Sequence, residues 1–539
     1  MEKASKGKKK TLALAALTLA STMLFSACSS NGNANVNGNS AGKGDGAAGK
    51  PVTLKVEVFD RGNAPAGSTI TDNYLTKFVQ DNFGTPNNIN VEFVPIPRSE
   101  EVQKLNVLMA SGSDVPDIVF TYDSGTFYRY AQQGGLTELG ALLDEHGPNL
   151  KKFLGEETIA YGQYEGKQYA LPARRAHLGK YSSFIRQDWL DKLGLPVPTT
   201  TEELYTTLKA FKEKDPGETG GKVIPLGMAL APAQYEPLIW SFIQPHSEEE
   251  RYTLTQQLGS RDYPTLLPGF KDALQFMNKV YNEGLMSADF SLDEDKKKLN
   301  EDAANGLVGF FSEDDMNPFY ADGLYATLQK NIPDAKLSAV DVYSNSEGKH
   351  PKPEYAPVGL YLMIPKSSER AVEAIKYLDW MASGDNLLYI QNGVEGENYT
   401  LQNGIPVMKA DATEEAKNRL FNAGDMGLIS NGKQLGDTEK NVEAYVYGMP
   451  EAFHEETRRA LTVSRSDTIK PVRFDRPIEA QGKYGTGLLD KFHEIIVKTT
   501  MVKPDQFEAT YEAAMKDYMA NGGQAILDER KEAYAAMSK

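Results

Sequence analysis

The sequence has 539 residues, a formal net charge of −16, and 40% hydrophobic and 10% aromatic residues. A chain of this length corresponds to roughly three or four domains or to two large lobes, and its apolar content excludes a disordered protein. The only long apolar run lies at the extreme N-terminus, which excludes a protein with several membrane spans. Because an acidic chain is repelled by phosphate backbones, we expect no binding of nucleic acid.

The first 27 residues have the order of a signal peptide. Lysines dominate residues 3–10, and an apolar stretch follows from Leu12 to Phe25. This stretch is too short to span a bilayer comfortably, but it fits the apolar region of a signal peptide. Ser26 and Ala27 then precede Cys28, the single cysteine of the chain, as in a bacterial lipoprotein box. We expect cleavage before Cys28 and a lipid on its sulfur; an ordinary secretory signal with a chance cysteine is the alternative.

Residues 28–50 predict a flexible tether. They are nearly all Ser, Asn, Gly and Ala, and such a segment buries too little apolar surface to offset the entropy of ordering. With a single cysteine the chain has no partner for an intramolecular disulfide. The sequence therefore predicts a globular body held at the extracellular face of the cell membrane by a lipid.

Residues 52–120 alternate between strand and helix patterns. Apolar residues alternate with polar ones over 52–58, and shorter apolar runs at 91–94 and 117–120 also predict strands, whereas 70–79 and 102–109 have helical spacing. This order favours parallel strands with right-handed crossovers. Ligands of such open sheets bind outside the carboxyl ends of the strands. The segments there are 59–61, Arg98 and 122–123, and each offers charge or an aromatic ring.

Three further extended segments, near Leu171, Phe310 and Leu360, are interpreted as crossings between two lobes. A helix is predicted over 371–382, and two C-terminal helices, over 506–519 and 524–537, are broken at Gly522 and Gly523.

Motifs of catalysis or metal binding are incomplete in this sequence. His454 and Glu455 lack the second histidine of a zinc-protease helix, and Asp293 leads into lysines without the glycine of an EF-hand loop. We assign no catalytic residue, no metal ligand and no cofactor. A pair of glycosidase carboxylates is not recognisable from sequence, because only its separation in space identifies it.

Several segments resemble extracellular solute-binding protein family 1. They are residues 115–120, 130–136, 166–172, 185–190 with 198–200, and 393–399. Each motif alone is loose, but their order and spacing cover nearly all of the mature chain. The loop at 393–399 and the C-terminal helices broken by two glycines resemble the lipoprotein branch found in Gram-positive bacteria, and maltose-binding protein is a more distant relative.

This resemblance implies an α/β protein of two lobes joined by hinge strands, a fold like that of periplasmic binding proteins. It also implies capture of an oligosaccharide and its delivery to the permease subunits of an ABC importer, by a monomer that performs no chemistry. Two alternatives stay open: a receptor for peptides or other solutes, and a surface glycoside hydrolase or polysaccharide lyase. We divide the chain into a signal peptide (1–27), the lipidated tether (28–50), a first lobe (51–172 and 312–358), and a second lobe with a C-terminal helical extension (173–311 and 359–539).

The candidate ligand-binding residues follow strand ends or lie near the expected crossings. A ring covers the apolar C–H face of a sugar, and charged groups pair with its hydroxyls. We expect Tyr122 and Trp240 to be opposing platforms in the cleft; for each candidate the structural alternative is a solvated loop, a local ion pair or core packing. The complete set is Asp60, Arg61, Tyr122, Asp123, Arg174, Arg175, Tyr235, Trp240 and Glu313.

Overall fold

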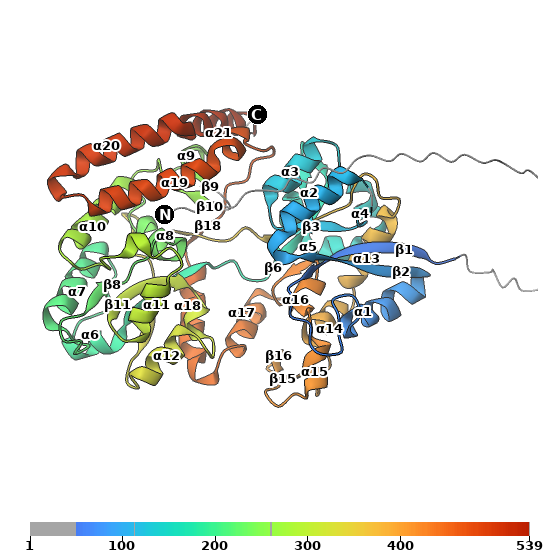
Figure 1. The fold of residues 1–539 in the computed structure, drawn as a ribbon, viewed down its shortest axis with the longest axis horizontal. Helices are drawn as coiled ribbons and strands as arrows, with labels where there is room; N and C mark the ends of the chain where they lie inside the picture. The colour runs from blue at the N-terminus through green and yellow to red at the C-terminus, as the bar shows by residue number, and fades with distance from the viewer. Residues whose placement is uncertain (1–49, 113, 259–260, 538–539) are drawn as a thin grey trace, which may run out of the picture. The chain divides into compact units, whose positions relative to one another are not determined.

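A computed structural model describes residues 50–112, 114–258 and 261–537 (Figure 1). The predicted signal peptide, Cys28 and nearly all of the tether lie outside the described residues. Two four-stranded sheets organise the rest, with strand orders β17-β6-β14-β3 and β12-β7-β11-β8. The expected two-lobe α/β fold is confirmed. Within the described ranges, no helix combines the length and apolar character needed to cross a bilayer.

The first lobe contains the predicted succession of strands and helices. β1 and β2 pair in parallel over their whole length, from Val52 opposite Ile89 to Asp60 opposite Pro97, and Val56 bridges Ile118 in parallel. The predicted parallel arrangement is therefore confirmed. The elements of this lobe are β1 (Val52–Asp60), α1 (Tyr74–Val79), β2 (Ile89–Pro97), α2 (Glu101–Ser111), β3 (Val119–Thr121), α3 (Ser124–Gln132), α4 (Gly140–His146), α5 (Pro148–Ala160), β4 (Gln163–Tyr164), β5 (Lys167–Gln168), β6 (Ala170–Arg175), β14 (Val358–Met363), α13 (Ala371–Met381), α14 (Asn386–Asn392), β15 (Tyr399–Gln402), β16 (Ile405–Met408), α15 (Glu414–Arg419), α16 (Ala423–Met426) and β17 (Ser430–Asn431).

The second lobe is built on the other four-stranded sheet and carries the C-terminal helices. In Figure 1 the helices α19, α20 and α21 lie side by side over this lobe, as expected for a C-terminal extension, and Leu488 and Phe492 of α19 enter its core. Its elements are β7 (Tyr181–Arg186), α6 (Gln187–Leu193), α7 (Thr201–Lys214), β8 (Ile224–Leu226), α8 (Pro232–Trp240), α9 (Glu248–Leu254), β9 (Gln256–Leu258), β10 (Arg261–Tyr263), α10 (Phe270–Asn282), α11 (Lys297–Ala304), β11 (Val308–Asp314), α12 (Leu324–Asn331), β12 (Leu337–Val340), α17 (Thr438–Tyr447), α18 (His454–Arg465), α19 (Glu479–Met501), α20 (Phe507–Tyr518) and α21 (Gln524–Met537).

The crossings between the lobes follow β6, β12 and β17, so part of the predicted division of the chain is wrong. β12 pairs with β7 of the second lobe, and β14 pairs with β3 and β6 of the first. Residues 312–340 therefore belong to the second lobe, and residues 358–431 to the first. Phe310 lies in β11, inside the second sheet, and is not a crossing. A buried strand has the same apolar pattern within a sheet and beside a hinge, which is why the pattern alone misplaced the boundary.

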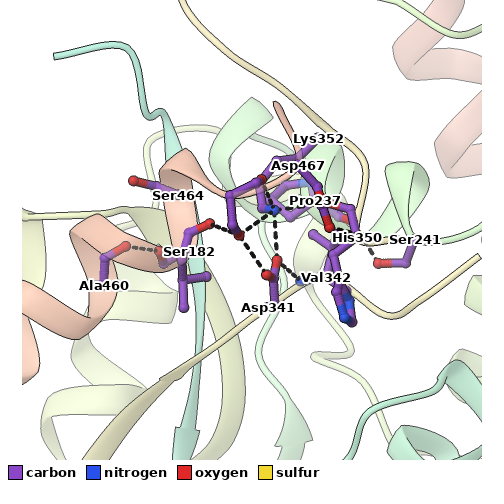
Figure 2. A network of polar contacts seen from close by, with 12 residues as sticks. Ser182, Pro237, Ser241, Asp341, Val342, His350, Lys352, Ala460, Ser464 and Asp467 are labelled. Atoms are coloured by element: carbon purple, nitrogen blue, oxygen red, sulfur yellow. Dashed lines mark hydrogen bonds and ion pairs between the residues drawn. The ribbon is translucent and has the colours of Figure 1, made fainter. Parts of the chain in front are cut away.

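A buried lysine holds the second crossing together (Figure 2). The Lys352 ammonium lies 2.8 Å from an Asp341 carboxylate oxygen and donates to the backbone oxygens of His350 (2.8 Å) and Ser466 (2.6 Å). The Ser466 hydroxyl donates to the second Asp341 oxygen at 2.8 Å. Lys352 begins β13 (Lys352–Pro353), which pairs with β18 (Thr468–Ile469). These contacts join the two ends of the second crossing to the distant segment at Ser466 in one polar cluster at the hinge.

Glu57 is a buried carboxyl in the middle of β1. One of its oxygens accepts from the Phe120 backbone N–H at 3.0 Å, and the other has no hydrogen-bond partner within the described ranges. Burial raises the pKa of Glu57 to about 8, and the negative charge of nearby Glu101 adds to the rise. At neutral pH the folded protein therefore holds this carboxyl mostly protonated.

We predict that Glu57→Gln stabilises the protein increasingly as the pH rises. In the wild type the folded state retains a proton that the unfolded state loses above pH 4.5, so this group lowers the free energy of unfolding as the pH rises towards 8. The difference between variant and wild type should grow by a few kcal/mol, on the order of 3–5, between pH 5 and pH 9. Chemical unfolding at several pH values measures it. Glu92→Gln, at an exposed position of β2, is the control, and parallel curves for Glu57→Gln and wild type would contradict the prediction.

Candidate ligand-binding site

Five strands of the first lobe end at one edge. β14 is antiparallel to both β3 and β6, β17 is parallel to β6, and β1, β2 and β3 share a direction. The carboxyl ends of β1, β2, β3, β6 and β17 therefore meet. The residues at or just after these ends are Arg61, Arg98, Tyr122, Arg175 and Asn431. This is the position at which open sheets of this kind bind ligands.

Tyr122 lies at this edge, as predicted. Its ring stacks on Phe59 with a centroid separation of 6.1 Å, and the Arg98 guanidinium lies over both rings, 4.7 Å from the Tyr122 centroid. Burial raises the pKa of the Tyr122 hydroxyl, and a hydrogen bond to the Asn431 side chain opposes the rise. The ring is half-buried, so one part of it packs on the lobe and another part faces outward.

Three other candidates at this edge make local contacts. The Arg61 guanidinium forms two hydrogen bonds with Asp425, at 2.6 and 2.8 Å. Asp60 accepts from the Gly62 backbone N–H at 2.8 Å. Asp123 caps α3, because its carboxylate accepts from the Gly125 and Thr126 backbone N–H groups. Asp60 and Asp123 therefore shape their loops, and Arg61 forms the ion pair that was the structural alternative, although its partner lies in a distant segment.

Arg174 and Arg175 occupy opposite faces of β6. The Arg174 guanidinium donates to the Phe153 backbone oxygen at 3.0 Å, on the α5 side. Arg175 donates to the Ala356 backbone oxygen at 3.2 Å and to the Asn431 side-chain oxygen at 3.1 Å. Its guanidinium lies 4.5 Å from the centroid of the Tyr355 ring. Arg175 is thus the member of the pair that joins the strand-end cluster.

Charged groups of the second lobe also lie near the Tyr355 ring. β8, β11 and β12 end at the edge where β7 begins, and Lys180 directly precedes β7. The Lys180 ammonium lies 5.2 Å from the Tyr355 centroid and 3.8 Å from a Glu236 oxygen. Arg261 donates to the Tyr181 hydroxyl at 3.2 Å and lies 3.8 Å from the other Glu236 oxygen. Tyr355, in the second crossing, therefore lies between cations of both lobes.

Further tyrosines surround Arg175. Burial raises the pKa of the Tyr445 hydroxyl to about 12, while the positive charge of Arg175 opposes the rise. Gly432 has a positive φ of 96°, and a Cβ at this position would collide with the Tyr445 hydroxyl. Only glycine therefore lets the third crossing pass so close to this ring. Tyr320 is 43% exposed, and Asp314 and Asp315 raise the pKa of its hydroxyl beyond the effect of burial.

Sequence patterns do not indicate four residues of this cluster, because they lie in crossings or in elements distant from the predicted strand ends: Lys180, Arg261, Tyr355 and Tyr445. The one available signal was the position of Tyr355, which closely precedes the strand predicted at 358–364.

The placement of Tyr235 and Trp240 in the cleft is wrong. Both side chains are 0% exposed and belong to the second-lobe core; the Tyr235 ring packs on Phe492 of α19, and the Arg251 guanidinium lies over Trp240. Every residue of α8 from Ala233 to Trp240 is buried. Trp240 therefore has no free face for a ligand, and it is not a platform opposing Tyr122.

Glu313 is engaged within the second lobe. The Lys296 ammonium contacts both of its carboxylate oxygens, at 2.7 and 2.9 Å, and Gln234 donates to one of them at 3.3 Å. The neighbouring Asp314 is the more available carboxyl at this edge: burial, and secondly Glu313, raise its pKa to about 7. Across residues 50–537, apart from the gaps, no cluster of three or more His, Cys, Asp or Glu side chains could hold a metal ion.

A cavity of about 480 Å³ adjoins the hinge on the α5 side, and Arg174 and Arg175 both line it, together with Glu157, Gln434 and Arg465 among others. Its lining includes none of the cluster tyrosines.

Two lobes whose strand ends face a shared set of rings and charges define a two-lobed solute-binding protein. The chain belongs to the bacterial extracellular solute-binding protein family, whose sequence profile matches residues 66–386. The family resemblance noted in the sequence is therefore confirmed.

Two curated relatives come from Bacillus subtilis (strain 168). Lipoprotein LipO is 29% identical over 322 residues, which are 58% of this chain and 61% of LipO, so the chain spans about three fifths of that relative. The polygalacturonan/rhamnogalacturonan-binding protein YtcQ is 25% identical over 471 residues, which are 83% of this chain and 86% of YtcQ. Among solved structures, an HMO-binding, ABC-transporter-associated solute-binding protein from Bifidobacterium longum infantis has the same fold, with a TM-score of 0.66, 19% identity, and coverage of 91% of this chain and 100% of that one.

We predict that Trp240→Ala lowers stability and leaves ligand affinity nearly unchanged. Removing a fully buried indole from a packed core costs about 3–5 kcal/mol of unfolding free energy. Chemical unfolding measures the loss, and calorimetric titration with a bound sugar tests the affinity. A variant that keeps its stability and loses ligand affinity would contradict this prediction and would indicate that Trp240 contacts the ligand.

Proposed function

We propose that this protein is a lipid-anchored extracellular receptor that captures an oligosaccharide and delivers it to an ABC importer. The observation that carries the proposal is the cluster of half-buried tyrosines and charged donors around Arg175, at the strand ends of both lobes. Half-buried rings can cover the C–H face of a sugar, and the charged groups beside them can bind its hydroxyls. The name of the relative YtcQ, which is similar over most of its length, supports a saccharide ligand.

The proposed mechanism is closure of the lobes on the ligand, which the permease subunits then recognise. The crossings after β6, β12 and β17 would act as the hinge. Within the described ranges, no hydrogen bond or ion pair joins Arg98 or Tyr122 of the first lobe to Arg261 or Asp314 of the second. Closure can therefore bring these groups onto a ligand without first breaking a direct contact between them. The receptor would act as a monomer and perform no chemistry.

Two other functions predict different outcomes. A peptide receptor would pair its ligand with exposed strand edges, whereas the candidate site here presents rings. A surface hydrolase or lyase would return cleaved sugar. Incubation with plant and microbial oligosaccharides, followed by mass spectrometry, separates the proposals: a receptor raises its melting temperature and returns the sugar intact.

We predict that Tyr355→Ala weakens oligosaccharide binding by roughly tenfold to a hundredfold, because it removes about 1–3 kcal/mol of contact with an aromatic face. Folding stability should change less, since the ring is only half-buried. Calorimetric titration and thermal unfolding of the same variant measure both effects. Tyr74→Ala, which removes a 41% exposed ring from α1, is the control. Equal affinity in Tyr355→Ala and wild type would place the ligand elsewhere.

We predict that Cys28→Ser releases the mature chain from the membrane fraction and leaves sugar affinity unchanged, because the composition of residues 28–50 predicts a tether between anchor and fold. Membrane fractionation with a salt wash measures the release, and Ser29→Ala, beside the proposed lipidation site, should stay anchored. A Cys28→Ser chain that remained in the membrane fraction would contradict the proposed anchor.

A further inference from the structure

Three cations approach the ring of Tyr355 or its surroundings, and two of them share one nearby carboxylate. Arg175 and Lys180 lie over the ring, 4.5 and 5.2 Å from its centroid. Arg261 opposes the rise in the pKa of the Tyr355 hydroxyl that burial causes, as Arg175 does. Glu236 is the carboxylate, and its oxygens lie 3.8 Å from both Lys180 and Arg261. These separations allow electrostatic attraction but exceed the length of a hydrogen bond.

Arg175 has no carboxylate partner among the described residues. Its guanidinium donates only to uncharged acceptors, which are the Ala356 and Val358 backbone oxygens and the Asn431 side chain. Burial lowers the pKa of Arg175. Neutral acceptors use up N–H donors without balancing the positive charge, so this half-buried cation is left uncompensated in the unliganded protein.

Lys180 and Glu236 also keep unused hydrogen-bonding capacity. Glu236 is fully buried, and neither of its oxygens accepts a hydrogen bond within the described ranges. Burial raises the pKa of Glu236, whereas Lys180 and Arg261 lower it. Burial lowers the pKa of Lys180. The ammonium of Lys180 therefore lies beside a counter-charge but retains donors for a further acceptor.

The other nearby carboxyls, Asp314 and Asp315, form no ion pair with Arg175 within the described ranges. Asp315 is occupied, because His177 contacts one of its oxygens at 2.7 Å and the Ser464 hydroxyl donates to the same oxygen at 2.6 Å. Asp314 has its pKa raised to about 7, so near neutral pH it carries only part of a negative charge. Arg175 thus keeps a positive charge without a carboxylate partner, in a chain whose net charge is −16.

We infer that the ligand is an acidic oligosaccharide containing uronic acid, with one sugar ring against Tyr355 and its carboxylate held by Arg175 and Lys180. This inference rests on the proposed function and narrows its substrate class. A uronate carboxylate supplies the missing negative charge and accepts the unused N–H donors, and charge-assisted hydrogen bonds of this kind are stronger than those to neutral hydroxyls. If the lobes closed on a neutral sugar, the positive charge of Arg175 would be enclosed without a negative charge to balance it.

The test compares acidic and neutral trisaccharides by calorimetric titration. The acidic set contains trimers of galacturonate, mannuronate, guluronate and glucuronate; the neutral set contains their methyl esters together with maltotriose and a fructan trimer. We expect at least one uronate trimer to bind about ten- to a hundredfold more tightly than its methyl ester, the usual range for a charge-assisted contact. Arg175→Gln should remove most of this preference. Arg459→Gln, whose guanidinium donates to the Ala339 backbone oxygen in the second lobe, is the matched control and should retain it.

The outcomes separate the inference from the proposed function. If a neutral trimer binds and every uronate binds more weakly, the inference is wrong and the receptor function stands. If the preference for the acid survives in Arg175→Gln, the assigned residue is wrong, and the inference fails in its stated form. If no sugar binds but trialanine does, both the inference and the saccharide function are wrong. Thermal unfolding of each variant shows whether a loss of binding comes from misfolding.

Discussion

The hydrogen bonds of one guanidinium position the centre of this molecule. Arg175 ends β6, and it reaches the Ala356 and Val358 backbone oxygens at the start of β14 and the Asn431 side chain at the end of β17. Two strands that leave the first lobe and one that returns to it are therefore joined by a single side chain. The same contacts leave the charge of Arg175 unbalanced beside the Tyr355 ring. Fold and binding surface thus depend on the same group.

The second crossing uses a different arrangement of charge. Lys352 is paired with Asp341 and also donates to two backbone oxygens, so its charge and its donors are both satisfied inside the protein. A buried ion pair whose hydrogen bonds are satisfied within the protein holds its segments in a fixed arrangement. It leaves few donors and little charge for a ligand. Arg175, at the end of β6, differs from Lys352 in this respect, because its charge has no carboxylate partner among the described residues and is available to the proposed ligand.

The local patterns of the first lobe were sufficient to predict its parallel strands. The alternation in 52–58 and the strand ends at Arg98 and Tyr122 led to the correct edge of the sheet, because strand direction follows from the β-α-β order alone. Position within an element was less certain: helical spacing over 70–79 predicted a helix, whereas α1 begins at Tyr74, after its N-cap Asn73.

Contacts distant in sequence account for the failures. Tyr235 is in the core because Phe492 and His493 of α19, which begins at Glu479, contact its ring, and nothing within residues 232–240 indicates those contacts. Tyr355 lies in a segment rich in proline and charge that has no strand or helix periodicity, yet two cations from different lobes meet at its ring. A binding site between lobes is made by such meetings, so its residues cannot be derived from periodicity. The electrostatic consequence follows from the same geometry: burial already removes much of the water around Arg175 and Lys180, and the proposed closure would remove more. The charge that a ligand brings then contributes most in the closed state, which is the condition under which binding and hinge motion become coupled.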